Sequence, residues 1–193
     1  MMLNIVLFGP PGAGKGTQSE KIIEKYHLTH ISTGDLFRKH LSEGTELGKL
    51  AKKYMDEGEL VPDEVVIRMV DLKIKEKKDT SGFIFDGFPR TVNQAKALDG
   101  LLENRRQPIS GMILLEVDEE ELKKRILLRA ETSGRSDDQD MEKINNRIRV
   151  YKEETLPVAG YYQKQGKLYG IKGVGSIEEI FQAICKAIDG LRV

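Results

Sequence analysis

The chain has 193 residues, enough for one core domain with insertions and a sizeable buried interior. Its 31 lysines and arginines balance its 31 aspartates and glutamates, so no overall charge attracts nucleic acid or membranes, and any electrostatic function is local. Neither a disulfide framework nor a four-ligand zinc site can be built from the single cysteine, Cys185, which fits a reducing cytoplasm.

The chain opens on an apolar run, Leu3–Phe8, which is too short for a secretory signal and reads as a buried strand. A glycine-rich stretch, Gly9–Thr17, follows, and 18–27 then reads as a helix. Such a turn directs backbone N–H groups and the positive end of the helix dipole into one concavity, where an anion binds. Lys15 adds a mobile positive charge suited to the outer phosphates of a nucleoside triphosphate.

The spacing of Gly9, four residues and Gly14-Lys15 fits the P-loop pattern, which then requires Ser or Thr. The chain instead has Gly16, with Thr17 one place later. We therefore expect Mg²⁺ to be held through waters and a distant carboxylate rather than by a direct hydroxyl ligand. The simpler alternative is an ordinary strand-to-helix turn whose glycines only allow a tight path.

Short apolar runs then alternate with longer amphipathic segments, which predicts βαβ units and a parallel sheet of five strands in one α/β domain, residues 1–193. The later strands are expected at 28–31, 82–85, 111–117 and 167–171. Two polar intervals, 32–61 and 130–138, do not fit this alternation and are interpreted as excursions from the sheet. Near the end of the chain, Cys185 shares a helical face with apolar residues, so we expect a core thiol.

The second predicted strand leads into a helix near Thr33. We expect Thr33 to be the N-cap, so that its hydroxyl and the nearby amides can meet a polar ligand. Arg38 follows one turn inside this helix.

The third strand delivers Asp86 to the carboxyl edge of the sheet, where open α/β folds bind ligands. Asp86 could there hold the water shell of a metal. Arg90 follows in a turn fixed by Gly87 and Pro89, well placed for a phosphate. The alternative makes Asp86 a turn-capping carboxylate and Arg90 a surface charge.

Four arginines form a further candidate set: Arg125, Arg129, Arg135 and Arg147. Arg125 and Arg129 are four apart on a predicted helix, so we expect them to point the same way. Glu121 precedes Arg125 by four residues, however, and a simple surface ion pair is an equal alternative for Arg125.

Together these motifs resemble the adenylate kinases of the nucleoside monophosphate kinase family, in the short-lid form. The resemblance covers essentially the whole chain and includes the departure at Gly16. It is carried in order by Gly9–Gln18, Ser32–Asp35, Leu60–Asp63, Asp86–Arg90 and Gly134–Asp138. It implies a three-layer P-loop fold, a monophosphate-binding excursion at 32–61 and a lid at 128–138 without the cysteines for zinc.

The resemblance also implies roles for individual residues. The ATP phosphates would lie on Gly12, Ala13, Gly14, Lys15, Gly16 and Thr17, with Arg129 against the triphosphate and the Gly175 backbone at the adenine. AMP would lie against Thr33, Arg38, the backbone of Glu59, Leu60 and Val61, the turn Gly87, Phe88, Pro89 and Arg90, and Gln94. Arg135 and Arg147 would span the transferred phosphoryl group, with Arg149 as the alternative to Arg147. The implied enzyme is a cytoplasmic monomer that uses Mg²⁺ to convert ATP and AMP into two ADP, maintaining adenine nucleotide balance.

The chemistry agrees with that reading. Transfer between two phosphates needs no general base, because the attacking oxygen is already ionised near neutral pH, and charge stabilisation by Lys15, Mg²⁺ and arginines is enough. None of the three histidines, His27, His30 and His40, lies in a loop with a catalytic pattern. Gln94 carries a donor and an acceptor that match the adenine edge, which favours AMP over the pyrimidine monophosphates and GMP. A P-loop hydrolase and a non-catalytic nucleotide sensor are the alternatives from other classes.

Overall fold

The computed structural model describes residues 2–77, 79–135 and 138–191. Within these residues one parallel sheet has the strand order β2-β3-β1-β4-β5. Its strands are β1 (Ile5–Phe8), β2 (Thr29–Ser32), β3 (Phe83–Asp86), β4 (Gly111–Glu116) and β5 (Leu168–Lys172). Each strand falls within two residues of its predicted bounds, and the predicted α/β P-loop fold is confirmed.

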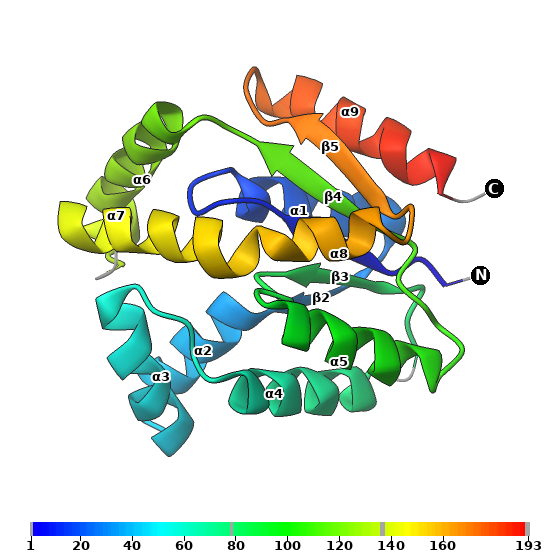
Figure 1. The fold of residues 1–193 in the computed structure, drawn as a ribbon, viewed down its shortest axis with the longest axis horizontal. Helices are drawn as coiled ribbons and strands as arrows, with labels where there is room; N and C mark the ends of the chain where they lie inside the picture. The colour runs from blue at the N-terminus through cyan, green and yellow to red at the C-terminus, as the bar shows by residue number, and fades with distance from the viewer. Residues whose placement is uncertain (1, 78, 136–137, 192–193) are drawn as a thin grey trace.

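Helices connect the strands and cover both faces of the sheet (Figure 1). They are α1 (Lys15–Tyr26), α2 (Thr33–Ser42), α3 (Glu46–Glu57), α4 (Asp63–Glu76), α5 (Val92–Glu103), α6 (Glu119–Ser133), α7 (Met141–Val150), α8 (Pro157–Gln163) and α9 (Ile177–Gly190). A π-helical segment, η2 (Tyr151–Thr155), joins α7 to α8, and the three run as one continuous helical path in Figure 1. Among the described residues, no helix is both long enough and apolar enough to cross a membrane.

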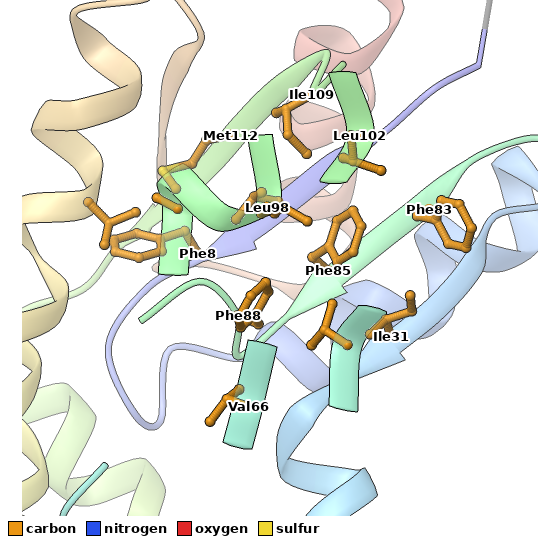
Figure 2. Close-up of a cluster of buried hydrophobic side chains, with 14 of the residues drawn as sticks. Phe8, Ile31, Val66, Phe83, Phe85, Phe88, Leu98, Leu102, Ile109 and Met112 are labelled. Atoms are coloured by element: carbon orange, nitrogen blue, oxygen red, sulfur yellow. The ribbon is translucent and has the colours of Figure 1, made fainter. Parts of the chain in front are cut away.

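Successive side chains of each strand pack against opposite layers, as the period of two requires. Ile5 and Leu7 of β1 join a cluster with α1 and α9, and the buried thiol of Cys185 lies in the same cluster, as predicted. Val6 and Phe8 face the other cluster, which α4, α5 and α8 complete. Figure 2 shows part of this second cluster, where Phe8, Phe85 and Phe88 from the edge near the glycine-rich loop meet side chains of the helices.

The excursion at 32–61 is helical, as expected, and consists mainly of α2 and α3. The two helices pack on each other, and α3 also contacts α7 (Figure 1). The other predicted excursion differs from expectation, because 130–133 is not loop but the last turn of α6. Gly134, with a φ of 62°, ends that helix in the left-handed conformation that glycine adopts without strain. Ser136 and Asp137 of the predicted lid lie outside the described residues.

Two helix starts also differ from prediction. The first helix begins at Lys15 rather than near 18, directly after Gly14. The N-cap of α2 is Ser32 and not Thr33, because the Ser32 hydroxyl accepts the hydrogen bond from the Asp35 N–H at 3.2 Å. Thr33 is the first helical residue, and its hydroxyl is thereby left for a contact with another strand end.

Candidate active site

A pocket opens at the carboxyl edge of the sheet, where the segments after β1, β2 and β3 meet the ends of α3 and α7. Most of the predicted acceptor-site residues line it, together with Lys15 of the glycine-rich loop. The predicted residues in its lining are Lys15, Thr33, Arg38, Glu59, Leu60, Val61, Gly87, Phe88, Pro89, Arg90 and Arg147. One cavity therefore joins the predicted phosphate loop to the predicted second substrate site.

The glycine-rich loop has the backbone that a phosphate cradle requires. Gly12 and Gly14 have φ values of 84° and 91°, in the left-handed region. A side chain at Gly12 would also collide with α6, because its Cβ would lie 2.8 Å from Ile126 Cγ1. Ala13 is buried, whereas Gly16 and Thr17 at the start of α1 are exposed to solvent.

The Lys15 side chain folds back over the loop that carries it. Its Nζ donates to the carbonyl oxygens of Gly9 at 2.8 Å and Pro10 at 3.0 Å. Burial lowers the pKa of Lys15 to about 8; nearby Asp86 opposes this shift, and Arg90, Arg147 and Arg129 reinforce it. Lys15 thus lies in a cluster of positive charges that an anionic ligand would stabilise.

The ends of β2 and β3 are tied together at one carbonyl. Both the Thr33 hydroxyl and Arg90 Nε donate to the oxygen of Gly87, each at 2.7 Å. Gly87 has a φ of 73°, and a Cβ there would lie 3.0 Å from both Thr33 Oγ1 and Arg90 Nη2. Phe88 anchors this turn in the core, and its peptide bond to Pro89 is cis. The turn therefore holds a hydroxyl and a guanidinium on one wall of the pocket.

Asp86 ends β3 and lies opposite Leu7 of β1, just before the glycine-rich loop. Its side chain is largely buried, and His30 Nε2 lies 3.6 Å from its Oδ2. In the part of the chain that the structure describes, no three His, Cys, Asp or Glu side chains gather as metal ligands. A single carboxylate beside a phosphate cradle fits Mg²⁺, which keeps several waters and takes its other ligands from substrate phosphates.

The side chains of the predicted arginines do not all contact the same partners. Arg125 donates to Glu121 at 2.8 Å and to the Gly173 carbonyl at 2.9 Å, so the prediction that it points with Arg129 is wrong. The Arg125 guanidinium is thus held by Glu121 of its own helix and by the loop after β5, which is a structural role. Gly175, two residues after Gly173, has a φ of 127° and begins the turn into α9.

Arg129 and Arg147 meet at Asp138, whose side chain is fully buried. Burial raises the pKa of Asp138, but hydrogen bonds and charge from Arg129 and Arg147 outweigh it and hold that pKa below its ordinary value. Arg135 lies in the loop between α6 and α7 and is half-buried. Arg149, the alternative to Arg147, does not line the pocket; it is half-exposed and donates to Asn146 and Glu153.

Arg38 lies against Gly34 and forms an ion pair with Asp35 one turn before it. Burial raises the pKa of Asp35, yet the hydrogen bond and charge of Arg38 bring the net pKa below its ordinary value. On the opposite wall, the end of α3 packs on α7. The Asn146 side chain donates to the Glu57 carbonyl at 2.6 Å and to Glu59 at 3.0 Å.

Gln94 lies just behind the Gly87–Arg90 turn and is 1% exposed. Its Oε1 accepts the Arg90 N–H at 2.8 Å, and its Nε2 donates to Asp63 at 2.8 Å. That Gln94 reads a base stays a prediction. No role was predicted for Asp63 or Asp138 from the sequence, although both lie in segments that carry the family resemblance. The available signal was a carboxylate within a run of predicted ligand-binding residues.

Comparisons with known proteins agree on one family. Residues 7–167 match the family model described as Adenylate kinase. The chain is 52% identical to an adenylate kinase of Flavobacterium psychrophilum over 190 residues, which cover 98% of this chain and 100% of the relative. It is 53% identical to the adenylate kinase of Flavobacterium johnsoniae and 52% identical to that of Bacteroides fragilis, each with the same coverage.

Proposed function

The chain belongs to the adenylate kinase family and transfers a phosphoryl group between ATP and AMP, and on that premise we propose which of its residues hold the two substrates. The reaction is reversible, gives two ADP and maintains the balance of adenine nucleotides. The observation that supports the proposed assignment is the shared pocket, in which Lys15 and Arg147 lie with the polar wall of Thr33 and Arg90.

ATP is the donor, bound with its phosphates on the amides of Gly12–Thr17. Lys15 exchanges its two carbonyl contacts for phosphate oxygens, and the anions return the pKa of Lys15 toward its ordinary value. Arg129 contacts the triphosphate, and the Gly175 backbone contacts the adenine. Mg²⁺ neutralises charge on the phosphate oxygens when it is bound, and Asp86 holds its water shell.

AMP is the acceptor, bound between the Gly87–Arg90 turn and the excursion at 32–61. Arg38 and Arg90 hold its phosphate, and the Thr33 hydroxyl and the backbone of Glu59–Val61 contact the nucleoside. Arg135 and Arg147 span the transferring phosphoryl group, whose equatorial charge they stabilise. No side chain removes a proton, because the attacking phosphate oxygen is already ionised, so positioning and charge stabilisation carry the catalysis.

The proposal includes two moving parts. The excursion at 32–61 closes over AMP, and the short lid at 128–138 closes over ATP and excludes water from the reactive phosphoryl group. The enzyme acts as a monomer in the cytoplasm, with no nucleic acid or membrane partner; the balanced charge and the single buried cysteine support this part of the proposal.

A coupled assay with ATP and each of AMP, CMP, UMP and GMP tests the acceptor assignment. AMP should be preferred by about a hundredfold or more in kcat/KM, since a buried polar pocket that faces the wrong base edge is left unpaired. Comparable turnover with CMP or UMP would contradict the assignment. In Gln94→Ala the loss should be largest for AMP, and an equal loss for all four acceptors would show that Gln94 supports the pocket without reading the base.

A further inference from the structure

Asp63 is the centre of a small polar network at the start of α4 and α5. Thr91 Oγ1 lies 3.1 Å and 3.0 Å from its two oxygens, Asn93 Nδ2 lies 3.0 Å from Oδ2, and Gln94 Nε2 lies 2.8 Å from Oδ1. Thr91 donates to Asp63, because a carboxylate only accepts hydrogen bonds, and the Thr91 oxygen at the same time accepts the Gln94 N–H as the N-cap of α5. Asp63 therefore accepts hydrogen bonds from three side chains.

These contacts leave Gln94 one orientation of its amide. The Asp63 carboxylate only accepts hydrogen bonds, so it requires the NH₂ group; the Arg90 N–H only donates, so it requires Oε1. Turning the amide over would place two donors together at Arg90 and two acceptors together at Asp63. With 1% of Gln94 exposed, water is not available to relieve either mismatch.

We propose that Asp63 is a specificity-determining positioning residue, which fixes the Gln94 amide in the orientation that pairs with adenine and rejects a 6-oxopurine. This inference rests on the proposed function of Gln94 as the residue that reads the acceptor base. Among the described residues, the hydrogen bonds of Gln94 use one of its two amide hydrogens and one of the two lone pairs of Oε1. The remaining hydrogen matches the adenine N1 acceptor, and the remaining lone pair matches the exocyclic amine.

A 6-oxopurine presents the reverse pattern, an acceptor at O6 and a donor at N1. A freely rotating amide would turn over and pair with either base. Discrimination therefore needs groups that make the second orientation costly. The Arg90 N–H supplies part of that cost, and Asp63, whose hydrogen bond involves a charged carboxylate and is the stronger of the two, supplies the larger part without contacting the base.

The test compares AMP with inosine monophosphate, which differs from AMP only at this base edge. In Asp63→Ala the ratio of kcat/KM for AMP to that for inosine monophosphate should fall about tenfold or more, the size expected when a hydrogen bond to a charged group no longer holds the amide. The change should appear in the KM of the monophosphate and leave the KM of ATP unchanged. Asp63→Asn should give a ratio between those of the parent and Asp63→Ala, because its amide oxygen can still accept from Gln94 but its amide can also turn over and donate.

Asn93→Ala is the matched control, since it removes another donor to Asp63 without touching the amide of Gln94, and it should keep the parent ratio. Asp63→Ser provides a second truncation if the alanine variant does not fold. An equal loss of activity with both monophosphates in the truncated variants would overturn the inference and leave Asp63 as a support for α5. If Gln94→Ala keeps the parent ratio, the base-reading role itself fails, which separates the two failures.

Discussion

Arg129 binds Asp138 through two parallel hydrogen bonds, from Nε to Oδ2 at 2.6 Å and from Nη2 to Oδ1 at 2.7 Å. Arg147 adds a third, from Nη1 to Oδ1 at 2.7 Å. The carboxylate thus orients two guanidinium groups that come from different helices. We infer that Asp138 keeps both arginines in place when no phosphate is bound.

Replacing this carboxylate should lower the free energy of unfolding. Asp138→Ala should cost about 2–3 kcal/mol, because it leaves two guanidinium groups without their shared acceptor. Chemical denaturation at pH 7 measures the loss. Asp140→Ala, which removes only the exposed N-cap of α7, is the control and should cost about 1 kcal/mol. Equal losses in the two variants would argue against a special role for Asp138.

The Asp138 contribution also has a defined pH range. Since the folded protein holds the pKa of Asp138 below its ordinary value, the stabilisation is complete above the ordinary aspartate pKa and is lost as the pH falls through the lower, folded value. The difference in unfolding free energy between the parent and Asp138→Asn should therefore stay constant from pH 7 to about pH 5 and shrink in stronger acid. A difference that already shrinks between pH 7 and pH 5 would contradict this assignment.

Lys15→Met should lower kcat by roughly two or more orders of magnitude, about 3 kcal/mol or more of lost transition-state stabilisation. Its fold should survive, because burial already disfavours the charged form of Lys15. Steady-state kinetics together with a thermal melt test both parts. A kcat within a few-fold of the parent would remove Lys15 from the mechanism.

The free enzyme should bind and use ATP less efficiently at alkaline pH. With the pKa of Lys15 lowered to about 8, the neutral amine predominates above that pH, and kcat/KM for ATP should fall as the pH rises further. A pH profile of kcat/KM measures this. Lys15→Arg is the matched comparison, because a guanidinium stays charged over the range, and its profile should lack the alkaline limb. Parallel profiles for the two proteins would assign the limb to another group.

Closure should be visible by amide hydrogen exchange. A bisubstrate mimic that joins ATP to AMP should protect both 32–61 and 130–138, because the proposed function has both segments close over the ligand. Within 130–138, the residues next to Gly134 should gain the most protection. Protection confined to Gly9–Thr17 would exclude closure of either excursion.

The periodic parts of the fold were predictable from the sequence, and the reason is physical. Val6 and Phe8 face one layer while Ile5 and Leu7 face the other, so both faces of the strand are buried and it reads as an unbroken apolar run. Helix starts were less certain. Ser32 and Thr33 both carry a hydroxyl that can cap, and residue type alone does not decide which of two neighbours accepts the first N–H.

Most residues of the candidate site could be predicted from the sequence, but the contacts between their side chains could not. The resemblance selected Arg129 and Arg147, but nothing in a polar loop without periodicity indicates that both would meet Asp138. For Arg125, the alternative of an ion pair with Glu121 is confirmed, whereas its second partner, the Gly173 carbonyl, comes from a distant strand end that helical spacing does not indicate. Pairings of this kind depend on the tertiary fold.

The π-helical segment between α7 and α8 changes the direction in which side chains point from the continuous helix that the three segments form. The Leu156 N–H bonds to the Tyr151 carbonyl five residues back, so one more residue fits into the turn than in an α-helix. Side chains after it are rotated by about 100° from where an unbroken α-helix would carry them. Arg147 can therefore line the pocket while Tyr162 fills the core. If the same residues formed a regular α-helix, one of these two side chains would be twisted away from its place, whereas deletion of one residue from the segment would let a regular helix keep both.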